Sequence, residues 1–580
     1  VDGKLPTILY VCGHARVEKN GVAYGNKTAY HHHGIWFARH GYVCMIIDTV
    51  ELGELRGEHH GTYSKGRWWW LSRGYTPAGL EAWASVRGLD YLETRPEVDK
   101  ERFGITGRSG GGSYSWWTAA IDERIKAAAP TAGITSMRNH VVDGVVEGHC
   151  DCMYHVNTQR WDYDRVAAMI APRALLVCNT DKDSIFPIDG VFQVYQNARK
   201  IYSLLGVEKN IGLQVAEGPH KDLQPLNIGA FHWFERFLKG ADPMQVIDEG
   251  ARKSLEPEVL KVFKDLPKDE LNTKIDETFV PKAKTPAVAA SKDEWVKQRD
   301  AWMTALREQV FAGWPRDAAA VVPTKENSSE RDGIRITAYD FESQPSVRLR
   351  LYVAHRAGLR AEDLELIALN VLDADGWQDF CNTYETRFSK LIETFPSTTH
   401  DEKAFESEKK MFESFKWGMA YLCPRGIGPT EWSGSAKAQT QRLRRFNLIG
   451  QTVDGMRVWD IRRGVQALKN VPGFEKTPLW IQGQRDMAVN NLYASLFEDG
   501  ITRIDLHDMP ASHDTGPAYL NVLKHLDIPQ ATAMALERTR VIIYDADDAR
   551  WNYAAGTGKL LKLPEKQWQV RKPMTEAQGQ

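Results

Sequence analysis

Short apolar runs alternate with helix-patterned stretches through about the first 240 residues of the chain. Leu80, Trp83, Val86 and Leu89 fall on one side of a helix over residues 79–93, and residues 113–124 predict another helix. The apolar runs are rich in Val, Ile and Leu and cover residues 5–13, 42–49, 102–107, 125–130, 172–179 and 211–216. Runs of this length predict strands buried on both faces. Strands that alternate with helices predict a doubly wound, mostly parallel α/β sheet.

The pattern changes after residue 245 and then returns. Residues 246–318 are rich in Lys, Asp, Glu, Pro and Ala, which predicts a linker with helical segments. Further strands are predicted at 333–340, 346–354, 364–372, 418–424, 477–482 and 502–507, the first two as a hairpin. We therefore expect domains at 1–245 and 319–580, the second ending in a C-terminal tail.

A local repeat links the two halves of the chain. The pattern G-x-T-x-x-G-x-x-x-W-x-x-x-R runs from Gly74 to Arg87 and again from Gly450 to Arg463, at a constant offset of 376 residues. Five matches at fixed spacing favour duplication of one unit, although a shared helix-packing requirement could produce the same pattern.

Composition narrows the classes of function. The 580 residues carry a net charge of −2, whereas a dedicated nucleic-acid binder needs a basic surface. No apolar run approaches the ~20 residues that span a bilayer, so we expect no membrane partner. The seven cysteines form no recognisable disulfide framework, which leaves the compartment open. An oligomer of identical chains is compatible with the sequence.

The strongest chemical signal is Gly107-Arg108-Ser109-Gly110-Gly111, a G-x-S-x-G between a predicted strand and a predicted helix. A nucleophilic serine at such a turn needs neighbours without a Cβ, which the glycines supply. Ser109 is therefore the candidate nucleophile. The N–H of Gly110, at the head of the helix, is a candidate donor to an oxyanion. The alternative is an ordinary glycine-rich turn.

A serine nucleophile needs a base and an acid that orients the base. His220 follows the last predicted strand of the first domain, which is where this fold places its base. Two carboxylates, Asp181 and Asp183, follow the strand at 172–179. We favour Asp183 as the acid, because Asp183 to Pro187 resembles the D-x-x-(apolar)-P pattern of the acid loop in serine hydrolases. Asp181 is then a capping or turn residue.

The remaining site predictions are weaker. A second oxyanion donor should come from the loop after the strand at 5–13, with the backbone N–H of His14 or Ala15 as candidates. Four side chains near the predicted site could line a substrate pocket: Arg108, Trp69, Trp117 and His149. Core packing is an equally good interpretation of the two tryptophans.

Two clusters invite a metal interpretation. Cys150 and Cys152 form C-x-C between His149 and His155, but zinc sites normally show C-x₂-C and a second pair at a defined distance. The run His31–His33 fits a solvated or partly packed helix start better than a ligand set. From these spacings we expect no metal and no cofactor.

Several of these motifs together resemble the acetyl xylan esterase-like branch of the α/β-hydrolases. They are YVCGH, FARHGYVCMIID, LDYLETRPEVD, GITGRSGG, GHCDCMYHVN, APRALLVCNTDKDSIFP and EGPH, within residues 5–240. The resemblance implies a carbohydrate esterase that removes acetyl or related groups from polysaccharides, with Ser109, Asp183 and His220 as its triad, and it implies export. That fold has strands before the one at 5–13, so we expect missing residues upstream of Val1.

The second domain contains no G-x-S-x-G. Extending the repeat without gaps places Arg485 at the position of Ser109. A rival alignment, which we prefer here, makes Asp486 a relic of the acid and His513 a relic of the base. We expect a degenerate, non-catalytic hydrolase-like partner domain that packs on the active-site cleft or shapes it.

The expected function is a serine esterase acting through an acyl-enzyme on short acyl esters, with a polysaccharide or small-molecule ester as substrate. Two alternatives stay open. One is a serine peptidase or thioesterase of the same fold, since fold does not fix the substrate. The other is a carbohydrate-binding or scaffold protein with a vestigial site.

Overall fold

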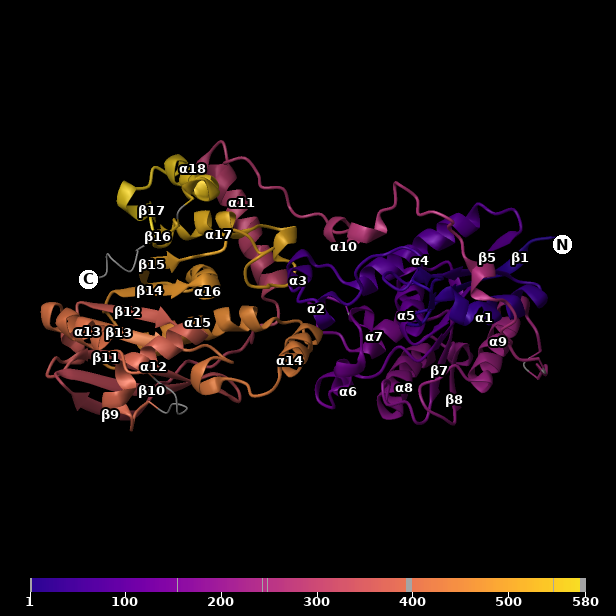
Figure 1. Cartoon of the computed structure of the whole chain (residues 1–580), viewed down its shortest axis with the longest axis horizontal. Coiled ribbons are helices and arrows are strands. Elements are labelled where there is room, and N and C mark those ends of the chain that lie inside the picture. Colours follow the sequence, from indigo (N-terminus) through magenta and orange to yellow (C-terminus); the bar gives the residue numbers. More distant parts are fainter. Residues whose placement is uncertain are drawn as a thin grey trace. The chain divides into compact units, whose positions relative to one another are not determined.

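A computed structural model describes residues 3–153, 155–242, 244–247, 249–392, 399–545 and 547–573. The chain divides into two compact units, which Figure 1 colours from indigo to magenta and from magenta to yellow. The first contains residues 1–70, 75–281 and 440–450, and the second contains residues 71–74, 282–439 and 451–580. The expected linker is thus divided between the units after Pro281, and a short segment from the second half of the sequence belongs to the first unit.

The first unit is built on a six-stranded sheet in which every neighbouring pair is parallel. In spatial order the strands are β4 (Val43–Ile47), β1 (Leu5–Val11), β5 (Val98–Arg108), β6 (Ile125–Thr131), β7 (Ala174–Thr180) and β8 (Ile211–Ala216). All six apolar runs of the first domain are strands, so the predicted doubly wound sheet is confirmed. A small hairpin of β2 (Glu18–Lys19) and β3 (Val22–Ala23) stands apart from it.

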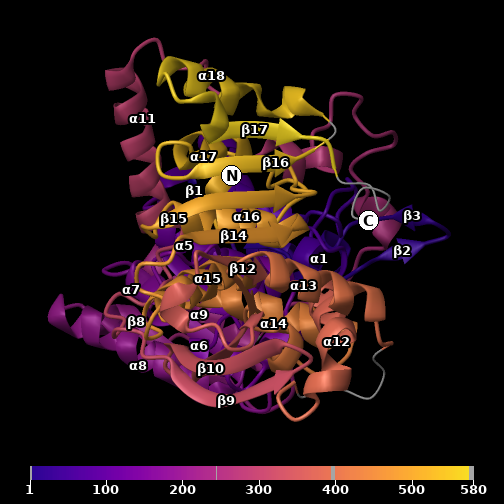
Figure 2. The same ribbon diagram turned by 90° about the vertical axis from the view of Figure 1, so that its left-hand side faces the viewer.

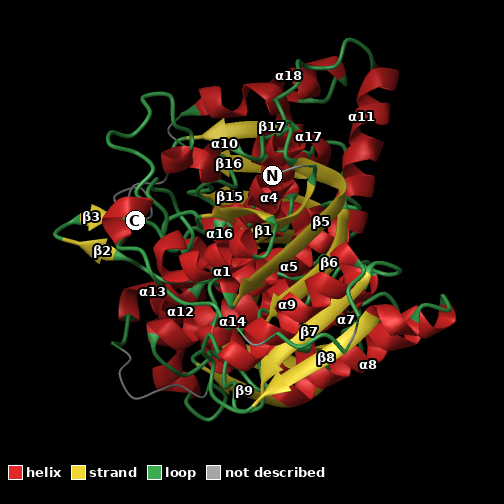
Figure 3. Ribbon diagram, turned by 90° about the vertical axis from the view of Figure 1, so that its right-hand side faces the viewer, coloured by secondary structure: helices red, strands yellow, loops and turns green. Residues whose placement is uncertain are grey.

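Helices cover both faces of this sheet (Figure 3). Helices α1 (Lys27–Arg39) and α9 (Gln224–Lys239) share one core cluster, which includes Trp36, Phe231 and Phe234. Helices α4 (Pro77–Glu93), α5 (Gly110–Ile121) and α8 (Ile188–Leu204) share the other, which includes Leu89 and Trp116. Shorter helices lie in the connections: α2 (Gly61–Ser64), α3 (Trp69–Arg73), α6 (Met137–Val141), α7 (Tyr163–Ala168) and α10 (Ile275–Thr278).

The second unit has a nine-stranded mixed sheet (Figure 2). Its order is β17 (Trp568–Arg571), β16 (Arg540–Tyr544), β15 (Ile501–His507), β14 (Leu479–Gln484), β12 (Leu366–Val371), β13 (Trp417–Leu422), β11 (Val347–Arg356), β10 (Ile334–Gln344) and β9 (Thr324–Arg331). Strands β17 to β13 run parallel, and β11, β10 and β9 add antiparallel pairs at one edge. The sequence did not predict β9, β16 or β17.

The helices of the second unit connect these strands. They are α11 (Lys292–Ala305), α12 (Ala374–Phe388), α13 (Glu402–Ser414), α15 (Val453–Lys469), α16 (Arg485–Ser495), α17 (Ile528–Ala535) and α18 (Asn552–Leu560). Helix α14 (Ala436–Leu448) begins in the second unit and ends in the segment that belongs to the first. Among the described residues, no helix combines the length and the apolar character needed to cross a bilayer.

The two units repeat one topology. The order β4-β1-β5-β6-β7-β8 in the first corresponds to β13-β12-β14-β15-β16-β17 in the second. In both sets of six strands, the strand that comes second in the sequence lies at the outer side of the strand that comes first. The sequence repeat marks equivalent helices, because Thr76 caps α4 and Thr452 caps α15, each accepting a hydrogen bond from the N–H of the glycine three residues later. Strand β14 therefore corresponds to β5, the strand that precedes Ser109.

Candidate active site

Ser109 occupies a sharp turn between β5 and α5. Its backbone has φ 59° and ψ −116°, a conformation that a non-glycine residue adopts only where the surroundings enforce it. Its N–H donates to the carbonyl of Thr131 at 2.9 Å. A Cβ on Gly107 or Gly111 would come within 2.2 or 2.0 Å of the Val11 carbonyl oxygen, so the flanking glycines are required for this packing. The turn holds the serine at the carboxyl edge of the sheet.

The structure brings the three predicted triad residues into one hydrogen-bonded chain. Nε2 of His220 lies 2.9 Å from Oγ of Ser109, and Nδ1 of His220 lies 2.6 Å from Oδ2 of Asp183. The residues come from loops after β5, β7 and β8, which end at the same edge of the parallel sheet. The imidazole can therefore accept the serine proton while its other nitrogen donates to the carboxylate.

Asp183 is built to stay ionised. Its side chain is 1% exposed, and its second oxygen accepts hydrogen bonds from the N–H groups of Ile185 and Phe186, both at 2.9 Å. Burial opposes ionisation, but the hydrogen bond from His220 and the two N–H donors outweigh it and lower the pKa of Asp183. Asp181 instead accepts from the N–H of Gly218 at 2.8 Å, which makes it part of the turn, as predicted.

A second carboxylate fixes the loop that carries the base. Asp222, two residues after His220, accepts hydrogen bonds at 3.1 Å from Nε2 of both His32 and His33 on α1. Burial opposes its ionisation, yet these two donors hold the pKa of Asp222 well below its ordinary range. The prediction of a solvated or partly packed His31–His33 run is corrected to a buried one, since all three side chains are at most 6% exposed.

The predicted oxyanion donors come from two segments, the start of α5 and the loop after β1. Gly110 is the first residue of α5, and the imidazole of His14 packs so closely that a Cβ on Gly110 would be 2.3 Å from its Nε2. The N–H of Ala15 donates to the Gly13 carbonyl at 3.0 Å, which makes the N–H of His14 the better candidate of the two. The N–H groups of Gly110 and His14 can therefore serve an oxyanion formed at Ser109.

The residues predicted for the substrate pocket have other surroundings. Trp69 packs in a cluster with Ile275 and Phe279, and Trp117 donates from its indole N–H to the Cys152 carbonyl at 3.2 Å. Arg108, the last residue of β5, helps to line a small cavity with Tyr10, His33 and Phe231. A role of these three side chains in a substrate pocket stays a prediction.

His149 supports the acid loop from behind. Its Nε2 donates to the carbonyl of Ile185 at 2.6 Å, and its ring stacks on Phe186 at 4.6 Å. The Phe186 ring in turn lies 5.7 Å from the ring of His220. Only 1% of His149 is exposed, so we assign it a positioning role instead of the predicted pocket role.

Two functional neighbours were missed in the sequence. Asp222 could have been suspected from its position two residues after His220. Arg444 carried no signal, because it lies in the other half of the sequence. It is fully buried in the first unit and donates to the carbonyls of Val146 and His149 at 3.0 and 2.6 Å.

The second unit preserves the turn but not the chemistry. Arg485 follows β14 with φ 52°, as Ser109 follows β5 with φ 59°. The gapless alignment is therefore the right one, and the preferred assignment of Asp486 and His513 as relics is wrong. His513 is buried after β15, with its ring nitrogens bonded to the Pro517 carbonyl and the Tyr493 hydroxyl.

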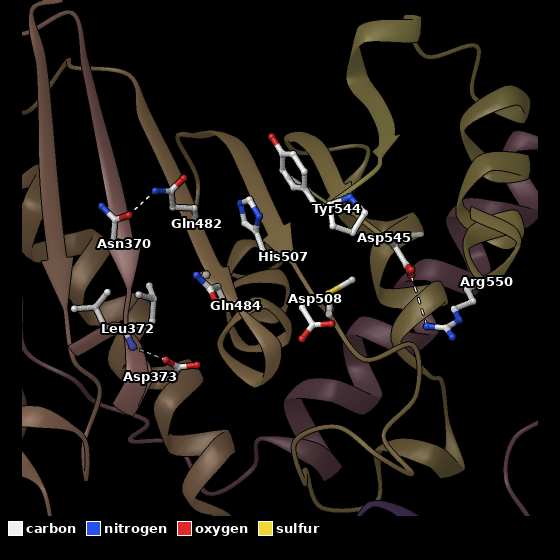
Figure 4. A pocket seen from close by; sticks show the side chains of 15 residues that line it. Asn370, Leu372, Asp373, Gln482, Gln484, His507, Asp508, Tyr544, Asp545 and Arg550 are labelled. Atoms are coloured by element: carbon white, nitrogen blue, oxygen red, sulfur yellow. Dashed lines mark hydrogen bonds and ion pairs between the residues drawn. The ribbon is translucent and has the colours of Figure 1, made fainter. Parts of the chain in front are cut away.

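A cavity of about 640 Å³ opens at the carboxyl ends of β12, β14, β15 and β16 in the second unit (Figure 4). Figure 4 shows side chains of Asn370, Gln482, Gln484 and His507 along it, and the ring of Tyr544 stacks on His507 at 4.1 Å. Its described lining includes neither serine nor cysteine. Ligands bind at this edge in many open α/β sheets, but a nucleophile like Ser109 does not line this cavity.

The match to a protein-family model lies almost entirely within the first unit. Residues 31–211 match the model of the prolyl oligopeptidase family. A curated relative, "Putative hydrolase YtaP" of Bacillus subtilis (strain 168), is 27% identical over 165 residues, or 28% of this chain and 54% of that protein. The chain thus spans about half the length of that relative.

Similar solved structures are esterases by name. They include a "putative acetyl xylan esterase" of Bacteroides fragilis NCTC 9343, with 12% identity, 50% of this chain and 78% of that chain covered, and a TM-score of 0.37. A glucuronoyl esterase from Caldicellulosiruptor kristjansonii has 18% identity, 44% and 73% coverage, and a TM-score of 0.31. The sheet order, the turn at Ser109 and the family match together make the first unit an α/β-hydrolase fold.

Proposed function

We propose that the first unit is a serine esterase that hydrolyses acetyl or other short acyl esters, with a polysaccharide ester as the favoured substrate class. The observation that carries the proposal is the hydrogen-bonded chain from Ser109 through His220 to Asp183. The preference for esters rests on the sequence motifs of residues 5–240.

The reaction follows from the position of each group. Oγ of Ser109 attacks the ester carbonyl while Nε2 of His220 accepts its proton, and Asp183 stabilises the imidazolium. The N–H groups of Gly110 and His14 donate to the oxyanion. Collapse expels the alkoxide, which takes the proton from His220 and leaves as an alcohol. Water, deprotonated by the same imidazole, then attacks the acyl-serine and releases the carboxylic acid and free Ser109.

The direct test compares wild type and Ser109→Ala on a chromogenic acetate and on acetylated xylan. We expect the substitution to lower kcat by about 10⁴–10⁶-fold. The matched control is Ser115→Ala in the same helix, whose hydroxyl donates to the Gly111 carbonyl and lies outside the triad. Full activity in Ser109→Ala would refute the proposal.

A second candidate is a serine peptidase of the same fold, which the match of residues 31–211 to the prolyl oligopeptidase family favours. The same triad cleaves amides and thioesters, so substrate rates must separate these reactions. A peptide amide and an acyl thioester therefore belong in the panel. Faster turnover of either than of the acetate would replace the esterase proposal, and failure of a fluorophosphonate to label Ser109 would favour a vestigial site.

A further inference from the structure

Four potential metal ligands converge beside the oxyanion loop of the first unit. His14 follows β1, His59 lies in the loop before α2, and Cys150 and Cys152 lie between α6 and α7. One ligand atom from each residue lies within 4.8 Å of every other. Sequence spacing pointed away from a metal here because the partners of the C-x-C pair come from loops about 90 and 135 residues earlier.

The distances within the cluster suit tetrahedral coordination. Nε2 of His14 lies 3.8 Å from Sγ of Cys150 and 3.5 Å from Sγ of Cys152. Zinc with ordinary Zn–S and Zn–N bonds places neighbouring sulfur and nitrogen ligands about 3.5 Å apart. The two sulfurs are 2.9 Å apart, closer than the ~3.8 Å of such a site, so coordination requires them to separate slightly.

Behind His59 stands a buried carboxylate. Nδ1 of His59 lies 2.8 Å from Oε1 of Glu81, and the two residues are 0% and 3% exposed. Nε2 of His59 is buried and makes no hydrogen bond of regular geometry among the described residues, while the His59 side chain interacts with the thiol of Cys150, another proposed ligand. A carboxylate beside one imidazole nitrogen while the other coordinates is the usual arrangement around protein-bound zinc. The contact between a buried imidazole and a buried thiol therefore fits two ligands of one ion.

The loops that carry the ligands are already joined. Asp151, between the two cysteines, accepts hydrogen bonds from the hydroxyl and N–H of Thr62 at 2.6 and 2.8 Å. It also pairs with the guanidinium of Arg444 at 3.3 Å. Helix α2, which begins two residues after His59, and the segment of Cys150 are thus held together by groups other than the proposed ligands. Such pre-organisation lowers the cost of ordering a site.

We propose that His14, His59, Cys150 and Cys152 form a closed Cys₂His₂ site for a divalent cation of the zinc class. Two thiolates balance the charge of the cation, and four protein ligands leave no position for substrate, so the site is structural. It ties three loops together against Gly110, on which the His14 ring packs. The metal site itself does not depend on the proposed esterase activity.

Elemental analysis of the full-length protein tests this directly. We expect about one zinc per chain after purification or after anaerobic reconstitution of the reduced protein. Substitution of cobalt should produce the visible absorption of a tetrahedral site, together with a thiolate charge-transfer band. The proposal is wrong if reduced wild type binds no zinc while the thiols of Cys150 and Cys152 remain titratable. It is also wrong if the two cysteines form a stable disulfide and the protein still binds no metal after that disulfide is reduced.

Variants locate the site. Cys152→Ser should lose stoichiometric zinc and the charge-transfer band, whereas Cys178→Ser, a buried cysteine in β7, should retain both. Glu81→Gln should weaken zinc binding by about 10–100-fold in competition with a chelator. Glu235→Gln, another largely buried glutamate on a helix, is its control. Unchanged zinc content in Cys152→Ser would place the metal elsewhere. Wild-type metal content decides the question if a variant fails to fold.

Discussion

At the scale of single residues, the sequence predicted the three members of the hydrogen-bonded chain better than the residues that support them. Ser109, Asp183 and His220 were predictable because strand–turn–helix punctuation and chain order restrict where a triad can stand. Asp222 and His149 were not assigned their roles, because Asp222 acts through a contact with helix α1 and His149 through a contact with the acid loop. The pattern of residues along the sequence does not show which distant residues come into contact. Supporting residues therefore need coordinates, whereas the members of a candidate triad can be predicted from the order of the strands.

The assignment of the acid can be tested by exchanging one atom. Asp183→Asn should lower kcat by about 10³–10⁴-fold on the chromogenic acetate, because the amide no longer holds His220 in the right tautomer. Asp181→Asn is the matched control, since that side chain accepts from the N–H of Gly218 and not from His220, and it should change kcat by less than about 10-fold. Equal losses in the two variants would leave the choice of acid unsupported.

The depressed pKa of Asp222 predicts acid sensitivity of the fold. A carboxyl whose pKa is lower in the folded state stabilises that state above its unfolded pKa of about 3.9 and loses this contribution as pH falls. The free energy of unfolding of wild type should therefore begin to drop below about pH 5 and keep dropping as the pH falls towards the depressed pKa of Asp222. Urea unfolding of Asp222→Asn should show a shallower drop, and the exposed Asp242→Asn should behave like wild type. Parallel curves for all three would contradict this account.

At the scale of elements, strong periodicity predicted strands well and weak periodicity did not. The polar segment that forms β9 lies at the edge of its sheet and buries little apolar surface, so no apolar run marks it. Strand β17 has only four residues. The turn after β14 was misassigned because an arginine side chain gives no sign that Arg485 has a positive φ like that of Ser109. The two units thus share a positive-φ turn at equivalent positions, with a serine in one and an arginine in the other.

The turn around Ser109 predicts an intolerance that is specific to position. A Cβ at Gly111 would lie 2.0 Å from a backbone oxygen, so the strand or the helix would have to move. Gly111→Ala should destabilise the protein by about 1–3 kcal/mol and lower kcat more than its stability loss explains. In Gly79→Ala the new methyl meets only the Thr76 hydroxyl at 3.8 Å, so stability should be unchanged. Thermal unfolding and kcat measured on both variants check this prediction.

At the scale of the whole molecule, two repeats of one topology were predictable, but the path of the chain between them was not. The equal strand orders agree with the repeat that begins at Gly74 and Gly450. The inclusion of residues 440–450 in the first unit was not foreseen, because helical periodicity gives no information about which core a helix joins. Contiguous boundaries drawn on the sequence therefore cannot describe the first unit completely.

Arg444 shows how much the first unit depends on that segment. Its guanidinium is fully buried, donates to two backbone carbonyls and pairs with Asp151, between the two cysteines. Arg444→Met keeps much of the side-chain volume but leaves these buried acceptors without their donor. We expect it to reduce the free energy of unfolding by about 3–5 kcal/mol, as breaking a buried ion pair does.

The neighbouring arginine provides the control for this prediction. Arg445 pairs with Glu147 on the surface, with about a third of its side chain exposed, so Arg445→Met should cost at most about 1 kcal/mol. Chemical denaturation followed by tryptophan fluorescence measures both variants. If the two substitutions cost the same, the segment 440–450 does not support the 145–153 region. If only Arg444→Met is destabilised and its kcat also falls, Arg444 helps to hold His149, which contacts the acid loop at Ile185.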